Sequence, residues 1–190
     1  MSTLNTIIKR CIELIKTTKI TPCRNQSFVD LSSGTHSRIS EWLEDKETKC
    51  KCCAITALLL SAVTKTNNED FPYGEIAYGT HVRILTQPSR ILDIPANRVA
   101  RIELFFEGSN GYHRTGDFGI VKTESCNALA FRSMYPWSLE RLCYIFQHLR
   151  NNQTFDSTKI MDDVTLDKDL AELLTLFPRA SIEPAFLIYS

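Results

Sequence analysis

Apolar residues recur at intervals of three and four along most of this chain, the spacing that places side chains on one face of a helix. The stretch from 3 to 16 has a broad apolar face with its polar residues on the opposite side. The stretch from 139 to 150 repeats this pattern behind Ser138, a residue type suited to cap a helix. The pattern predicts helices over 3–16, 37–43, 52–63, 95–107, 139–150 and 165–177.

Two of these helices carry further information about the fold. Residues 52–63 are apolar almost all round, which is typical of a central helix that others pack against. The helix after Leu92 can begin at an Asp93 cap, or with Pro95 in its first turn, where the missing N–H costs nothing. Gly108 follows the last apolar residues of that helix and predicts a left-handed C-terminal cap.

The chain becomes irregular after this cap, because four of its seven glycines fall between 108 and 119. The remaining predicted elements are a helix at 74–88, a small hairpin of 118–121 with 128–131, and a terminal strand at 185–189. We therefore expect a mainly α fold. The expected fold is a single compact helical domain over residues 1–190 with a short glycine-rich β or irregular excursion.

Composition and charge narrow the class of protein. A content of 43% hydrophobic and 23% charged residues is that of an ordinary globular protein. Lys and Arg number 22, as do Asp and Glu, so a net charge of zero argues against a surface that attracts nucleic acid or anionic lipid as a whole. The longest near-apolar run is too short to cross a bilayer, so we expect no membrane partner. Seven cysteines, three of them crowded within four residues, favour a reducing, cytoplasmic setting over a disulfide framework.

Three helical segments form a recognisable set. They are the cysteine-led apolar helix that starts at Cys53, the helix from Ile94 to the Phe-Glu-Gly turn at Gly108, and the helix from Leu139 to the asparagine-rich stretch before Phe155. Together they resemble a family of small uncharacterised, mostly helical bacterial and phage proteins. The resemblance covers about half of the chain and implies a helical fold, but it carries no assigned activity.

Residues 86–103 also resemble a helix-turn-helix. With Asp93 at the turn, small and apolar residues fall at the positions that pack the two helices of that motif. Asn97, Arg98 and Arg101 then lie near the DNA groove, where asparagine and arginine make bidentate contacts to adenine and guanine edges. The resemblance implies a DNA-binding regulator as an alternative function. Asp93 stands where the motif usually has glycine, and the same arginines also fit the solvated face of a core helix.

Cys50, Cys52 and Cys53 offer thiols for a metal site or a redox role. A zinc site needs four ligands, and Cys50 with Cys53 supply two at Cys-x-x-Cys spacing. The other two would come from Cys11, Cys23, His36 or His148. We expect Cys53 to be buried as a small hydrophobe, and Cys50 and Cys52 to lie at a helix start, where the dipole lowers the pKa of a thiol. Because no second pair of that spacing occurs, packing is the favoured interpretation and no metal or cofactor is predicted.

A hydrolase-type enzyme is a second alternative. Nucleophilic catalysis needs a nucleophile, a base within hydrogen-bonding reach and a group that orients the base. His113, Asp117 and Cys126 supply these residue types in or near the glycine-rich stretch. No nucleophile elbow, phosphate loop or dinucleotide fingerprint occurs in the sequence, so we predict no catalytic residue.

An aromatic stretch before a predicted helix favours binding to another protein. Arg132, Met134, Tyr135 and Trp137 belong to the residue types enriched at binding hot spots. Their place before a helix cap predicts a loop, where such side chains are harder to bury. Packing of Met134 and Trp137 against the following helix is the alternative interpretation. We predict that the protein acts by protein–protein binding through these four residues, and that the acidic segment 156–169 complements a basic partner.

Overall fold

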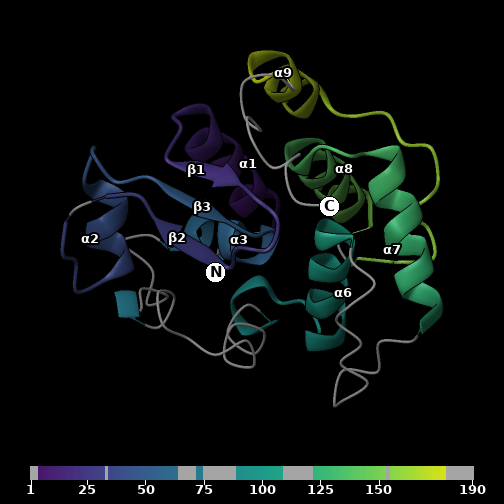
Figure 1. Ribbon diagram of the computed structural model, residues 1–190, viewed down its shortest axis with the longest axis horizontal. Helices are drawn as coiled ribbons and strands as arrows, with labels where there is room; N and C mark the ends of the chain where they lie inside the picture. The colour runs from purple at the N-terminus through teal and green to yellow at the C-terminus, as the bar shows by residue number, and fades with distance from the viewer. Residues whose placement is uncertain are drawn as a thin grey trace, which may run out of the picture.

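The structure is a computed structural model that describes residues 4–32, 34–63, 72–74, 89–108, 122–152 and 155–178. Helices dominate this part of the chain, which confirms the predicted mainly α fold (Figure 1). The helices are α1 (Leu4–Lys16), α2 (Ile39–Glu44), α3 (Ala54–Ala62), α6 (Ala96–Glu107), α7 (Lys122–Met134), α8 (Ser138–Asn152) and α9 (Lys168–Leu176). The strands are β1 (Ile20–Pro22), β2 (Phe28–Asp30) and β3 (Cys50–Cys52). No helix among the described residues is long and apolar enough to cross a membrane.

The centre of the fold is α3. All of its residues are buried, which confirms the prediction of a central helix without a polar face. Helix α1 packs on one side of α3 through its predicted apolar face, and α6 packs on another side. Helices α8 and α9 then cover the remaining side of α1, with α9 along the top edge of the view in Figure 1. A single hydrophobic core connects these elements.

A three-stranded sheet beside α3 was not predicted from the sequence. Strand β3 lies in the middle, parallel to β1 with Ile20 opposite Cys50, and antiparallel to β2 with Phe28 opposite Cys52. The prediction that Cys50 and Cys52 lie at a helix start is therefore wrong: both are buried in β3, and α3 begins after Cys53. Strands of three residues are too short to show an alternating pattern, and their pairing partners are distant in sequence.

Helix α6 begins and ends close to where the sequence predicts. Its N-cap is Pro95, and its C-cap is Gly108, which has a φ of 56° and donates its N–H to the Leu104 carbonyl at 2.9 Å. A Cβ added to Gly108 would lie 2.5 Å from Cβ of Arg132 on α7. Gly108 therefore serves both the left-handed turn and the close approach of the two helices.

Helix α7 replaces a predicted strand. Residues 128–131 do not form part of a hairpin, because they lie within α7, where Ala128 and Phe131 both face the core. Three residues separate these two side chains, which is the spacing of one helical face. The predicted partner strand at 118–121, most of the predicted helix at 74–88 and the predicted terminal strand lie outside the described residues.

One fully buried cation joins the ends of three helices. The guanidinium of Arg141, on α8, donates to the Phe106 carbonyl at 2.7 Å and to the Tyr135 and Pro136 carbonyls at 2.8 and 2.7 Å. It also donates to Oγ of Ser138 at 3.2 Å. The Phe106 carbonyl is among the last of α6, where the helix dipole favours a positive charge. Arg141 thus connects the end of α6 to the link between α7 and α8.

Helix α9 is held by a second arginine. Arg150 of α8 makes two hydrogen bonds of 2.7 Å to the Asp169 carboxylate and one of 3.0 Å to Asp167. Leu170 and Leu173 of α9 are buried in the hydrophobic core. Of the two starts that the sequence allows for the last helix, Thr165 and Asp167, the structure has Asp167 as the N-cap.

We expect Arg141→Ala to lower the free energy of unfolding by about 3 kcal/mol or more, because it leaves several buried acceptors without donors. Urea unfolding followed by circular dichroism measures this change. The control is Lys46→Ala, which removes an exposed cation and should change stability by less than about 0.5 kcal/mol. Equal stabilities of the two variants would contradict the role given to Arg141.

Candidate partner-binding surface

The four predicted binding residues do not lie together on a loop. Arg132 and Met134 belong to the last turn of α7, and a short link from Tyr135 to Trp137 leads directly into α8. Trp137 is only 6% exposed, so it packs into the core, as the alternative interpretation holds. The loop prediction is wrong because α7 continues to Met134, with Ala128 and Phe131 on its buried face.

Met134 and Tyr135 are the two predicted residues that reach the surface. Met134 is 50% exposed at the end of α7, and Tyr135 is half-buried beside it. Arg132 is turned toward α6, where its Nη1 donates to the Gly108 carbonyl at 3.3 Å. Arg132 and Trp137 therefore have structural contacts within the fold, whereas Met134 and Tyr135 reach the surface.

Tyr135 belongs to a row of five aromatic rings, which we name the aromatic ladder: Phe155, Phe105, Phe131, Tyr135 and Tyr144. Neighbouring ring centroids along it are 5.7, 5.7, 5.0 and 3.9 Å apart in that order. The first three contacts are edge-to-face, and the last, between Tyr135 and Tyr144, is stacked at 25°. Both geometries are favoured for aromatic pairs.

The aromatic ladder runs from the core to the surface. Its three phenylalanines are fully buried, whereas Tyr135 and Tyr144 are half-buried. Packing within the ladder therefore fixes the positions of the outer rings in the unbound protein. A surface held in this way loses little side-chain freedom on binding.

Two acidic residues, Glu140 and Asp163, lie near the outer end of the ladder. Burial, together with the neighbouring Tyr144, Asp163 and Glu140, raises the pKa of Tyr135 to about 12. Glu140 lies one helical turn before Tyr144 on α8, so the two side chains share a face. The segment 155–167, which carries Asp163, runs beside this end of α7 in Figure 1.

We name this surface the α7–α8 corner, defined by Met134, Tyr135, Glu140, Tyr144 and Asp163. Tyr144 and Glu140 are not among the binding residues predicted from the sequence. Their four-residue spacing on a predicted helix is visible in the sequence, but the stacking of Tyr144 on Tyr135 depends on the angle between two helices. That angle is not encoded in either helix alone.

The turn before α6 has a left-handed residue at the position that the sequence predicts for the turn of a helix-turn-helix. Helical residues end at Leu92, Asp93 has a φ of 54°, and the Ile94 N–H donates to the Ser89 carbonyl at 3.2 Å. Asp93 therefore adopts the left-handed conformation for which the motif uses glycine, and aspartate tolerates this conformation better than most residues.

The three residues predicted to contact DNA differ in their surroundings. Asn97 is exposed. Arg101 forms a salt bridge of 3.0 Å with Glu124 of α7, and the half-buried Arg98 is close enough to Asp156 for its charge to help lower the pKa of that carboxyl. Arg101 is thus paired within the protein, whereas Nη1 of Arg98 has no hydrogen-bond partner among the described residues. DNA binding stays a prediction.

The crowded cysteines are packed in the core. Burial raises the pKa of Cys52 and Cys53 well above the ordinary thiol value, so both are neutral thiols. Cys11 lies near them and is also fully buried. Within the described ranges, no group of three or more His, Cys, Asp or Glu side chains is arranged to hold a metal ion.

Two of the three residues proposed for a hydrolase lie outside the described residues. These are His113 and Asp117. Cys126 is exposed on α7. The hydrolase alternative stays a prediction.

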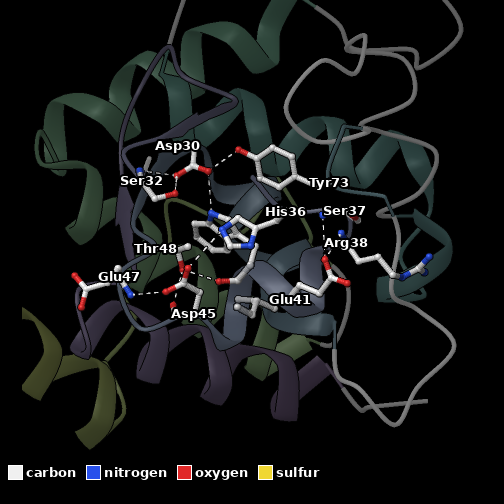
Figure 2. Close-up of polar contacts among 12 residues, drawn as sticks. Asp30, Ser32, His36, Ser37, Arg38, Glu41, Asp45, Glu47, Thr48 and Tyr73 are labelled. Atoms are coloured by element: carbon white, nitrogen blue, oxygen red, sulfur yellow. Dashed lines mark hydrogen bonds and ion pairs between the residues drawn. The ribbon is translucent and has the colours of Figure 1, made fainter. Parts of the chain in front are cut away.

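The structure also assembles a polar cluster that the sequence analysis did not find (Figure 2). Oδ2 of Asp30, on β2, accepts hydrogen bonds from Trp42 Nε1 at 2.9 Å and from the Tyr73 hydroxyl at 2.5 Å. Its Oδ1 accepts bonds from the backbone N–H and the hydroxyl of Ser32. Although burial opposes the effect, these bonds keep the pKa of Asp30 below its ordinary value. Four donors saturate the carboxylate, so it is a structural acceptor and not a free base.

His36 completes this cluster without adding a reactive pair. Its Nε2 lies 3.7 Å from Oδ2 of Asp45, and its ring lies against Tyr73 with centroids 6.3 Å apart (Figure 2). A Cβ on Gly34 would come within 2.8 Å of the same nitrogen, so the loop before α2 folds tightly over the ring. The cluster connects β2, α2 and Tyr73.

A second buried polar group lies between α6 and α3. The carboxyl of Glu103 accepts hydrogen bonds from the Ile55 backbone at the start of α3 and from the Cys53 thiol. Burial, together with the charge of Glu107 one turn away, raises the pKa of Glu103 to about 7. Its Oε2 has no hydrogen-bond partner among the described residues. Glu103 is therefore a buried carboxyl whose protonation changes near neutral pH.

Comparisons with protein-family models, with curated proteins and with solved structures found no match. The family resemblance described from the sequence stays a prediction. Support for a function therefore comes from the geometry of the chain itself.

We expect Glu103 to make the protein less stable as the pH rises. Its pKa is higher in the folded than in the unfolded state, so its contribution is complete below about pH 4.5 and is lost as the pH rises through about 7. The full loss is about 3 kcal/mol. Urea unfolding across this range, with carboxyl NMR titration of Glu103, measures the effect.

Glu103→Gln should flatten this part of the stability profile, whereas the exposed control Glu13→Gln should leave it unchanged. His148 contributes with the opposite sign, because burial lowers its pKa and stability is lost as the pH falls. A profile that stays unchanged in Glu103→Gln would show that Glu103 is not the titrating group.

Proposed function

We propose that this protein acts by binding another protein through the α7–α8 corner. The observation that carries the proposal is the aromatic ladder, which holds Tyr135 and Tyr144 in fixed positions at the surface. Met134 lies next to them and is half exposed. Tyrosines and methionine enclosed by charged side chains are the composition expected of a binding hot spot with its polar rim.

Rigid aromatic side chains favour affinity for a physical reason. A tyrosine presents a large contact area but has few rotatable bonds, and the ladder has already restricted them. Little of the binding free energy is therefore lost to ordering these side chains when the partner binds. The exposed methionine adds a flexible apolar side chain that adapts to the shape of a partner.

The acidic neighbours of the corner favour a protein over a nucleic acid at this surface. Glu140 and Asp163 repel phosphates, and Arg132, the nearby cation on α7, is engaged with the end of α6. The arginines of α6 have acidic neighbours of their own. These charges support a polypeptide as the partner.

Met134→Lys tests the proposal without disturbing the core. We expect it to reduce recovery of the protein's binding partners at least tenfold, since a charge replaces an apolar contact at the centre of the surface. Affinity capture from cell extract with quantitative mass spectrometry measures recovery. Trp137→Ala is unsuitable, because Trp137 is buried and its loss would perturb the fold.

The matched control is Leu176→Lys. Leu176 is 54% exposed on α9, close to the 50% of Met134, so the control places the same charge on an equally exposed apolar residue away from the corner. Partners that bind wild type and Leu176→Lys but not Met134→Lys support the proposal. Identical partners for all three proteins would refute it.

A further inference from the structure

We propose that the outer face of the three-stranded sheet binds an acidic polypeptide segment that also carries apolar side chains. We name this surface the outer sheet face, defined by Thr21, Val29, Leu31, Lys49 and Lys51. The sheet lies left of centre and α7 at the right in Figure 1, so this surface is separate from the α7–α8 corner. A partner at the outer sheet face would be additional to one bound at the corner.

The strand register places the five side chains on one face of the sheet. Lys51 lies opposite Thr21 of β1 and opposite Val29 of β2. Leu31 and Lys49 form the next pair, because the Leu31 N–H donates to the Lys49 carbonyl at 2.8 Å. Residues two apart on a strand share a face, and so do residues directly opposite each other on neighbouring strands. The two lysines therefore form one row, and the two apolar side chains form the adjacent row.

The other face of the sheet is covered by the core. Ile20, Cys50 and Cys52 are buried on it, and helices α1, α3 and α8 contact β1. Asp30 lies opposite Cys50 on this inner face, where it accepts a hydrogen bond from Trp42 of α2. The helices that contact the sheet thus pack on its inner face.

The outer sheet face combines exposed apolar area with positive charge. Val29 is 37% and Leu31 is 56% exposed, and they are two of the four large apolar side chains exposed among the described residues. Lys49 is exposed and Lys51 is half-buried. Within the described ranges neither lysine forms an ion pair, and no member of the face is acidic. The face therefore offers two cations and an apolar row to a partner of complementary charge.

This combination fits an acidic polypeptide better than a surface of phosphates. The carboxylates of one segment can pair with the lysines while its apolar side chains cover Val29 and Leu31. A nucleic acid would place its charged backbone against the apolar row. Anionic lipid surfaces are recognised by clusters of about four to eight Lys or Arg residues, whereas the outer sheet face supplies Lys49 and Lys51 alone.

The row of lysines also sets the spacing expected of the partner's carboxylates. Lys49 and Lys51 are two residues apart on β3, so their Cα atoms are separated by about 6.6 Å. Acidic residues at alternate positions of an extended segment have the same spacing. The residues between them point to the opposite side of that segment. A segment lying between the two rows can therefore turn its carboxylates toward the lysines and its apolar side chains toward Val29 and Leu31.

Fluorescence anisotropy at low salt tests the inference with three labelled peptides of equal length. In the first peptide glutamate alternates with valine, in the second glutamine replaces glutamate, and in the third serine replaces valine. We expect wild type to bind the first peptide several-fold more tightly than either of the others. This binding should weaken as salt is added, because the charges involved are exposed.

The double variant Lys49→Glu/Lys51→Glu should weaken binding of the first peptide about tenfold or more, since it replaces attraction by repulsion. Its control is Lys9→Glu/Lys168→Glu, which makes the same change in net charge at exposed lysines on α1 and α9. This control should bind the peptide nearly as well as wild type.

Leu31→Ser should weaken binding several-fold through loss of apolar contact. The matched control is Leu176→Ser, because Leu176 is 54% exposed on α9, close to the 56% of Leu31. We expect the control to leave the affinity for the peptide unchanged.

Three results would overturn the inference. Equal weakening by both double variants would reduce the effect to overall charge. Equal affinity of wild type for the three peptides would remove the chemistry proposed for the partner. Binding to vesicles of anionic lipid, without binding to the first peptide, would assign the face to a lipid surface instead. Met134→Lys should bind the peptide like wild type, so failure at the outer sheet face is distinguishable from failure of the α7–α8 corner.

Discussion

The buried guanidinium of Arg141 is the contact on which the arrangement of α6, α7 and α8 depends. It donates to a carbonyl at the end of α6 and to two carbonyls in the link between α7 and α8. A cation can remain in the core only if its donors are satisfied, so those carbonyls must stay where they are. The angle at which α7 meets α8 is thereby restrained, and with it the place where Tyr135 stacks on Tyr144.

The Asp30 cluster and the α7–α8 corner differ in the surface that they offer to a ligand. The four hydrogen bonds to Asp30 use every acceptor site of its carboxylate, so this cluster stabilises the fold and has nothing left to offer a ligand. At the α7–α8 corner, Met134 is half exposed and Asp163 is exposed. This difference, more than residue type, is what favours the corner as a site of recognition.

Helix α6 shows how one charged pattern can serve a purpose that neither of its two sequence interpretations anticipates. Its charged residues fit a DNA-reading helix or a solvated face equally well. In the fold, Arg101 pairs with Glu124, Glu103 contacts the start of α3, and Glu107 accepts a hydrogen bond from the Asn25 backbone. The charged side chains of α6 thus connect it to neighbouring elements. The raised pKa of Glu103 is the energetic consequence of placing such a contact in the interior.

The sequence by itself determined most of the helices, with the exception of α7, and the apolar faces that form the core. Helical periodicity, Gly108 and the start of α9 are local signals, because hydrogen bonding and backbone conformation within a helix depend on residues close in the chain. Only the tertiary structure decided the sheet, whose three-residue strands pair across distant segments, and the engagement of the α6 charges. It also decided which aromatic residues are exposed: Trp137 is buried, and Tyr144 joins Tyr135 because α7 and α8 meet at one particular angle. Contacts between separate elements depend on packing, which no single segment encodes.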